Sequence, residues 1–291
     1  MENAKALIIF AVQGSMFLLI LAIAMQSKWA CVVDLLRSPR PLLRGVLAVN
    51  IVVPLVALLV SLAVKLDDPV EAGLLLMAVS PLAPLVPGNA LKMGVDRSRM
   101  MAYYAVLAFL AIVFVPITVW LIATVRGGYA VAPIGLIAKV VAITILLPIV
   151  IGMAMQALAP DLSNKAARFV SLVATIILLV GFILIMFAIW KPILSLIGNG
   201  TIIAFAIPVL AGLVAGHLLG GPNWHRRGAL AVTAAIRHPG IAGAIATANG
   251  AGPRAQAAIL LFLLNGFILT TLYKVWYKRN QPAGTPDAVP V

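Results

Sequence analysis

Few side chains in this sequence could bind a charged ligand or exchange a proton, and two of them are adjacent. Arg237 and His238 interrupt an apolar stretch and are followed by Pro239 and Gly240. A guanidinium at the centre of a membrane-spanning helix costs about 2.5–3.5 kcal/mol on insertion scales, so Arg237 needs a partner. No acidic residue is expected beside it, because all eight acids are predicted at helix ends or in loops: Glu2, Asp34, Asp67, Asp68, Glu71, Asp96, Asp161 and Asp287.

Three roles for Arg237 therefore stay open. It could be a built-in cation held by backbone carbonyl oxygens, or a forked donor for an anionic substrate. It could also be a side chain that extends to a membrane interface. His238 is the one titratable group predicted near it, and either takes part in proton coupling or caps a helix end.

The remaining reactive side chains do not form an enzyme site. No Ser, His and acid group together as a nucleophile with its base, and no His pair has the spacing of metal ligands. The single cysteine, Cys31, cannot form an intramolecular disulfide. We expect neither an enzyme nor a metal centre nor a bound cofactor.

The amino-acid composition indicates the class of protein in which these residues lie. Of the 291 residues, 63% are hydrophobic and only 10% charged, and the mean hydropathy is +1.13. A soluble fold of this size could not bury so much apolar surface. We therefore predict an all-α polytopic membrane protein, with about nine spans at residues 5–25, 41–64, 69–95, 98–125, 131–157, 163–190, 199–220, 225–248 and 252–277.

Two of these spans are broken by helix-terminating residues. The third contains Pro84, Pro87, Gly88 and Asn89, and the eighth contains Arg237 through Gly240. Pro84 and His238 are 154 positions apart, as are Pro54 and Pro208. A shift by five spans reverses direction across the membrane. The sequence thus predicts an inverted repeat whose two broken helices cross near the midplane.

Polar residues on the other spans have two interpretations. Asn50, Asn249 and Asn265 could line a cavity or serve as hydrogen-bonding contacts between helices.

Charge predicts the orientation. The net charge is +13, but the basic residues lie in short clusters between apolar runs, which is typical of cytoplasmic loops and not of nucleic-acid binding. We expect the N-terminus outside, the C-terminus in the cytoplasm, and a bacterial inner (cell) membrane. Residues 278–291 are expected to form a disordered cytoplasmic tail.

From about residue 10 to residue 277 the chain resembles the bile acid:sodium symporters. The similarity is clearest in RSPRPLLRG (residues 37–45), at Pro54, from Gly73 to Pro81, and in Gly240-Ile241-Ala242. The resemblance implies alternating access by two parts, with a small or amphipathic organic anion and sodium bound beside the crossing. The panel would comprise spans 5–25, 131–157 and 163–190, and the core spans 41–64, 69–95, 98–125, 199–220, 225–248 and 252–277.

The positions that hold sodium in this family are occupied differently here. They correspond to Val49, Leu85, Val86, Arg99, Tyr103, Thr233, Arg237, His238 and Pro239, with Asn89 as an alternative in the third span. A guanidinium within a few ångströms of an ion position repels a cation. The residues thus argue against the sodium coupling that the resemblance implies. A proton-coupled or uncoupled organic anion exchanger, and a non-transporting membrane binding protein, remain as alternatives, in each case with the option of a homo-oligomer.

Overall fold

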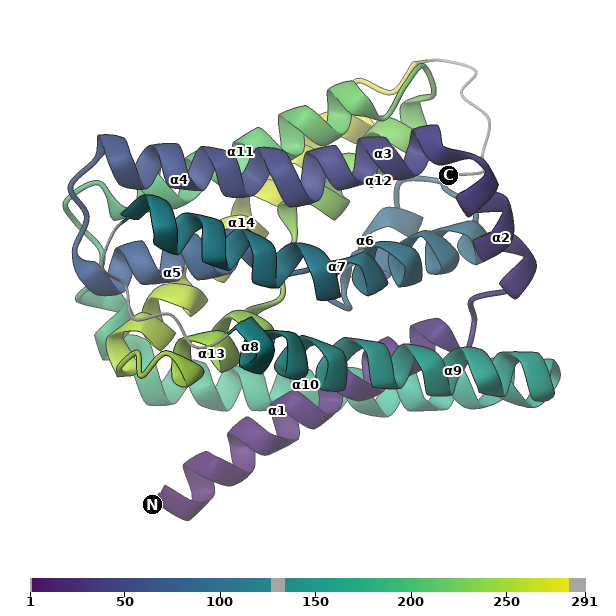
Figure 1. The fold of residues 1–291 in the computed structure, drawn as a ribbon, viewed down its shortest axis with the longest axis horizontal. Coiled ribbons are helices and arrows are strands. Elements are labelled where there is room, and N and C mark those ends of the chain that lie inside the picture. Colours follow the sequence, from purple (N-terminus) through teal and green to yellow (C-terminus); the bar gives the residue numbers. More distant parts are fainter. Residues whose placement is uncertain (1, 127–133, 283–291) are drawn as a thin grey trace.

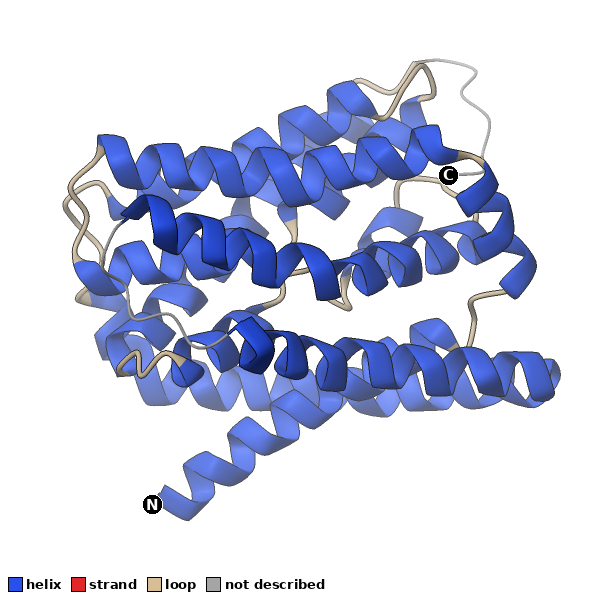
Figure 2. Ribbon diagram, viewed as in Figure 1, coloured by secondary structure: helices blue, strands red, loops and turns tan. Residues whose placement is uncertain are grey.

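The computed structural model describes the backbone of residues 2–126 and 134–282, and the side chains of this range except those of residues 2–6, 9 and 134. Helices form all the regular structure in these ranges, as Figure 2 shows. They are α1 (Glu2–Ala24), α2 (Trp29–Arg37), α3 (Pro39–Val46), α4 (Val53–Ala63), α5 (Asp68–Val79), α6 (Val86–Leu91), α7 (Arg97–Arg126), α8 (Ile134–Val141), α9 (Leu147–Leu158), α10 (Pro160–Leu194), α11 (Thr201–Leu219), α12 (Trp224–Ala235), α13 (Pro239–Ala248) and α14 (Pro253–Arg279).

The predicted all-α polytopic membrane fold is confirmed. Six continuous helices in the described ranges are long and apolar enough to cross a membrane. The bent pair α1 and α2 is a seventh candidate. The pairs α5–α6 and α12–α13 occupy the two spans predicted to be broken. The count of nine spans stays a prediction.

Two short π-helical segments join helices that the sequence predicts as single spans. One, Leu47–Val52, connects α3 to α4, and the other, Ala142–Leu146, connects α8 to α9. Each ends just before a proline, Pro54 or Pro148. A proline lacks the amide donor and crowds the preceding turn, so the widened turn relieves both problems.

The structure corrects two expectations at the ends of spans. Residues 29–37 were expected to be a loop, yet they form α2, which is bent by 80° from α1 and stops before Pro39. The predicted tail begins too early, because α14 continues to Arg279. Residues 283–291 of that tail, including Asp287, lie outside the described residues.

Helices α1, α9 and α10 lie side by side at the bottom of Figure 1, with α8 leading into α9. The contact between α1 and α9 is close, since a Cβ atom on Gly152 would lie 2.6 Å from Cβ of Ala24. Helices α4, α5, α7, α11 and α14 lie above this group in the figure. The division into a panel and a core stays a prediction.

Small residues bring the upper helices together. A Cβ atom on Gly216 of α11 would lie 2.5 Å from the Ala231 Cα and from the Leu230 carbonyl oxygen of α12. A Cβ atom on Gly73 of α5 would lie 2.5 Å from Cβ of Ala258 on α14. Such close backbone approach is how helices associate without a strong hydrophobic driving force. It fixes α5 and α12, the first helices of the two broken pairs, against continuous helices.

We predict that Gly216→Ala destabilises the protein. The new methyl group meets backbone atoms, which cannot move aside as a flexible side chain can, so the cost should be about 1–3 kcal/mol. The thermal unfolding midpoint in detergent measures it. Gly14→Ala on α1 is the matched control, because nothing lies within 4 Å of its added Cβ atom. Equal midpoints for the two variants would contradict the close packing of α11 on α12.

Candidate functional site

The two helix breaks cross and pair with each other. Between α5 and α6 and between α12 and α13 the chain is extended, and Leu82 and Arg237 form an isolated antiparallel bridge. The His238 amide donates to the Pro81 carbonyl oxygen over 3.0 Å, and the Ala83 amide donates to that of Ile236 over 3.4 Å. Irregular backbone buried in a membrane protein must find such internal partners.

Arg237 lies at the centre of this crossing. Its side chain is only 2% exposed. Nη1 donates to the Ser80 carbonyl oxygen over 3.2 Å, and Nη2 donates to the Val49 carbonyl oxygen over 2.5 Å. The guanidinium therefore joins the break of the second pair to the end of α5 and to the π segment before α4.

Both acceptors are carbonyl groups that the local helices do not fully use. Ser80 is the C-terminal cap of α5, where carbonyl groups lose their intrahelical partners. Val49 lies in the π segment five residues before Pro54, whose nitrogen has no hydrogen to donate. The prolines that break or bend these helices thus leave the carbonyl oxygens of Ser80 and Val49 available to bind the cation.

This geometry decides part of the question about Arg237. The hypothesis that it extends to a membrane interface is wrong, because the guanidinium is buried inside the protein and bonded at the crossing. The two ion pairs of the described residues join Arg99 to Asp34 and Arg126 to Glu71, and neither includes Arg237. The contacts fit a built-in cation. Direct binding of an anionic substrate stays a prediction.

His238 caps α13. Its Nδ1 accepts a hydrogen bond from the Ile241 amide over 3.3 Å, so Nδ1 is the acceptor nitrogen of the ring in this arrangement. Nε2 is buried and has no hydrogen-bond partner among the described residues. The adjacent Gly240 lies against α1, since a Cβ atom there would be 2.6 Å from Sδ of Met16. His238 and Gly240 thus lie where the crossing meets the lower helix group.

The first break brings fewer of the predicted residues to the crossing. Pro84 is buried in the turn before α6, and Pro87 is buried in α6, whereas Gly88 is exposed. The Asn89 side chain is directed elsewhere: Nδ2 donates to Leu85 over 2.9 Å, and Oδ1 accepts from Lys274 on α14 over 3.0 Å. Asn89 therefore ties α6 to the end of α14.

The other predicted polar residues, Asn50, Asn249 and Asn265, lie in three different settings. Asn265 of α14 donates to the Ile202 carbonyl oxygen of α11 over 2.8 Å, which is a contact between helices. Asn249 donates to Ile245 over 2.8 Å at the end of α13. Asn50 is half-buried, and its Nδ2 has no hydrogen-bond partner in residues 7–126 and 135–282. Of the three, Asn50 is the nearest in sequence to a residue that binds Arg237.

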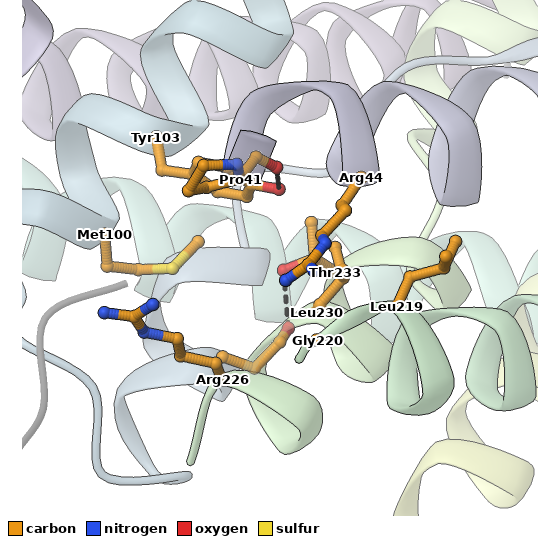
Figure 3. Close-up of a pocket in the computed structure, with 10 residues that line it drawn as sticks. Pro41, Arg44, Met100, Tyr103, Leu219, Gly220, Arg226, Leu230 and Thr233 are labelled. Atoms are coloured by element: carbon orange, nitrogen blue, oxygen red, sulfur yellow. Dashed lines mark hydrogen bonds between the residues drawn. The ribbon is translucent and has the colours of Figure 1, made fainter. Parts of the chain in front are cut away.

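A small pocket reaches two of the positions that correspond to family ion ligands, Thr233 and Tyr103. It has a volume of about 30 Å³, and Figure 3 shows Arg44 extending into it towards Thr233. The Thr233 hydroxyl donates to Ala229 over 2.7 Å, and the Tyr103 hydroxyl donates to Pro41 over 3.2 Å. With these hydroxyl groups turned to backbone carbonyls and an arginine beside them, the pocket is a poor cation site.

Sequence reasoning found Arg237 but missed what binds it. Val49 and Ser80 take part through backbone carbonyl groups, which no residue type reveals. Pro54 and Pro81 were the available signals, because each disturbs the helix that contains one of these carbonyls. Lys274, which lies in α14 and binds Asn89, was not among the predicted site residues.

The fold and the crossing define a class: an all-α polytopic membrane protein built around two broken helices. Residues 15–195, more than half of the chain, match the model of the Sodium Bile acid symporter family, and the chain belongs to that family. Members of this family are transporters, not enzymes. No curated protein matches the chain. The matched region includes the first break and Val49 but ends before Arg237.

We predict that Arg237→Met lowers the thermal unfolding midpoint. The change leaves two buried carbonyl groups without donors, at about 1–3 kcal/mol each. Arg237→Lys should recover part of the loss, because an ammonium group keeps the positive charge but lacks the planar, forked set of N–H donors of a guanidinium. The exposed Arg40→Met is the control for losing one arginine. A midpoint for Arg237→Met equal to that of the control would show that the guanidinium does not hold the crossing.

Proposed function

We propose that this protein is a secondary transporter that moves a small or amphipathic organic anion by alternating access, with Arg237 in the role of a bound sodium ion. The observation that carries this proposal is the pair of hydrogen bonds from Arg237 to Ser80 and Val49. Family membership supports the transporter class.

A fixed cation changes what the crossing can bind. Two like unit charges 4 Å apart repel by about 4 kcal/mol at an effective dielectric constant of 20. Sodium beside the guanidinium would have to overcome this repulsion, and the positions of the family's ion-binding side chains hold residues such as Val49 and Thr233. The same positive charge attracts an anion. The crossing is thus suited to an anionic substrate without a coupling sodium ion.

The contact between the crossing and α1 indicates where movement would act. Gly240 of α13 lies against Met16 of α1, and α1 packs with α9 and α10. We propose that the panel formed by α1, α8, α9 and α10 moves against the remaining helices, while the hydrogen bonds of Arg237 keep the crossing intact. We place the protein in a bacterial inner membrane with its C-terminus in the cytoplasm.

Proton coupling is a second candidate, and His238 favours it. Its Nε2 is buried without a partner in the described part of the chain, next to Gly240 and the α1 contact. Protonation of Nδ1 would require the loss of the cap on α13. Uncoupled exchange needs no such change. A binding protein that does not transport is the remaining alternative, and a homo-oligomer is compatible with each.

The test is transport in proteoliposomes that contain potassium as the only alkali cation. We expect labelled 4-phenylbutyrate or cholate to exchange across the membrane without a sodium gradient. A pH gradient that drives accumulation in the wild type, and not in His238→Gln, would select proton coupling. Binding of the anions without any flux would contradict transport and leave a membrane binding protein.

A further inference from the structure

A large cavity lies between α5, α7 and the turn from α13 to α14. Its volume is about 580 Å³, within the range of about 300–1,000 Å³ typical of small-molecule sites. Every wall comes from helices or turns that we assign to the core. The cavity therefore differs from the substrate position between panel and core.

The cavity extends along the whole of α5. Its lining includes Asp68, the first residue of that helix, and Val79, the last. Twelve helical residues rise by roughly 16 Å from first to last. Val79 directly precedes Ser80, whose carbonyl oxygen accepts from Arg237. The cavity thus runs from the outer end of α5 to a position beside the crossing.

The walls are apolar and the polar groups are few. Leu75, Val79 and Ile122 are buried side chains of the lining. Asp68, Asn249 and Arg254 are the lining residues with polar side chains. Such a surface suits a ligand with an elongated apolar body and a small polar group.

The charges at the cavity differ in how well the protein compensates them. Asp68 lies in the first turn of α5, where the helix dipole stabilises a carboxylate. Arg254 lies in the first turn of α14, where the dipole disfavours a cation. Arg254 is exposed and has no hydrogen bond or ion pair with any residue that the structure describes. Of these two charges, the positive charge of Arg254 is the one that the protein does not compensate.

We propose that this cavity binds an elongated amphipathic organic anion, with its acidic group on Arg254 and its apolar body along α5. The inference rests on the proposed function and deepens it, because it assigns an outer binding site from which the anion reaches the crossing. The recognised features are one negative charge and an apolar body, which match the cation and the walls respectively.

The test uses 4-phenylbutyrate and the cationic analogue 4-phenylbutylamine, which share an apolar body. Isothermal titration of the wild type in nanodiscs should show the carboxylate binding about tenfold more tightly than the amine. Arg254→Gln should remove most of this preference. Lys65→Gln is the control, because Lys65 is an exposed cation that is not among the residues lining the cavity.

A second pair of variants tests the walls without changing charge. Ala123→Phe on α7 puts a ring into the cavity and should weaken carboxylate binding by about tenfold or more. Leu121→Phe on the same helix is the control, since that side chain is 50% exposed and does not line the cavity.

The outcomes separate the two proposals. Carboxylate binding that neither Arg254→Gln nor Ala123→Phe alters would overturn the outer site while the transport proposal stands. Equal binding of carboxylate and amine by the wild type would also overturn the outer site. Cavity-dependent binding of 4-phenylbutyrate, with no flux of that anion in proteoliposomes, would support the outer site and contradict transport.

Discussion

The fold depends on one buried residue, Arg237, which supplies hydrogen-bond partners to irregular segments of backbone. The Arg237 side chain bonds to the end of α5 and to the π segment before α4, while its own backbone pairs with Leu82. Each piece exists because a proline prevents a regular helix there. In a bilayer no water can satisfy the groups that are left over, so the protein must supply the partners itself.

The Arg237 guanidinium at the crossing differs from a bound ion in one physical respect. The stabilisation that a bound ion gives depends on the ratio of its free concentration to its dissociation constant. A guanidinium attached to the chain is present in every molecule and at every step of a transport cycle. In the proposed mechanism the crossing would therefore stay assembled while the panel moves, and its charge would remain available to attract an anion, directly or through the cavity along α5.

The apolar runs predicted the helices well, because membrane spans need long uninterrupted apolar sequence; within each predicted span, the first and the last helical residue lie within four residues of its predicted limits. Prolines predicted both breaks. Other features had no such signal: α2 has only nine residues, and the acceptors for Arg237 are backbone atoms. The cavity along α5 arises from packing between distant helices, which local sequence does not encode. The inverted repeat remains a prediction from the offset of the breaks.

The most direct test of Arg237 as a built-in cation is the thermal unfolding midpoint of the wild type in sodium and in potassium at equal ionic strength. A ligand at 100 times its dissociation constant stabilises by about 2.7 kcal/mol, which is easily detected. We predict the same midpoint in both salts. A midpoint that rises specifically with sodium would show that an ion still binds, and would contradict the replacement of sodium by Arg237.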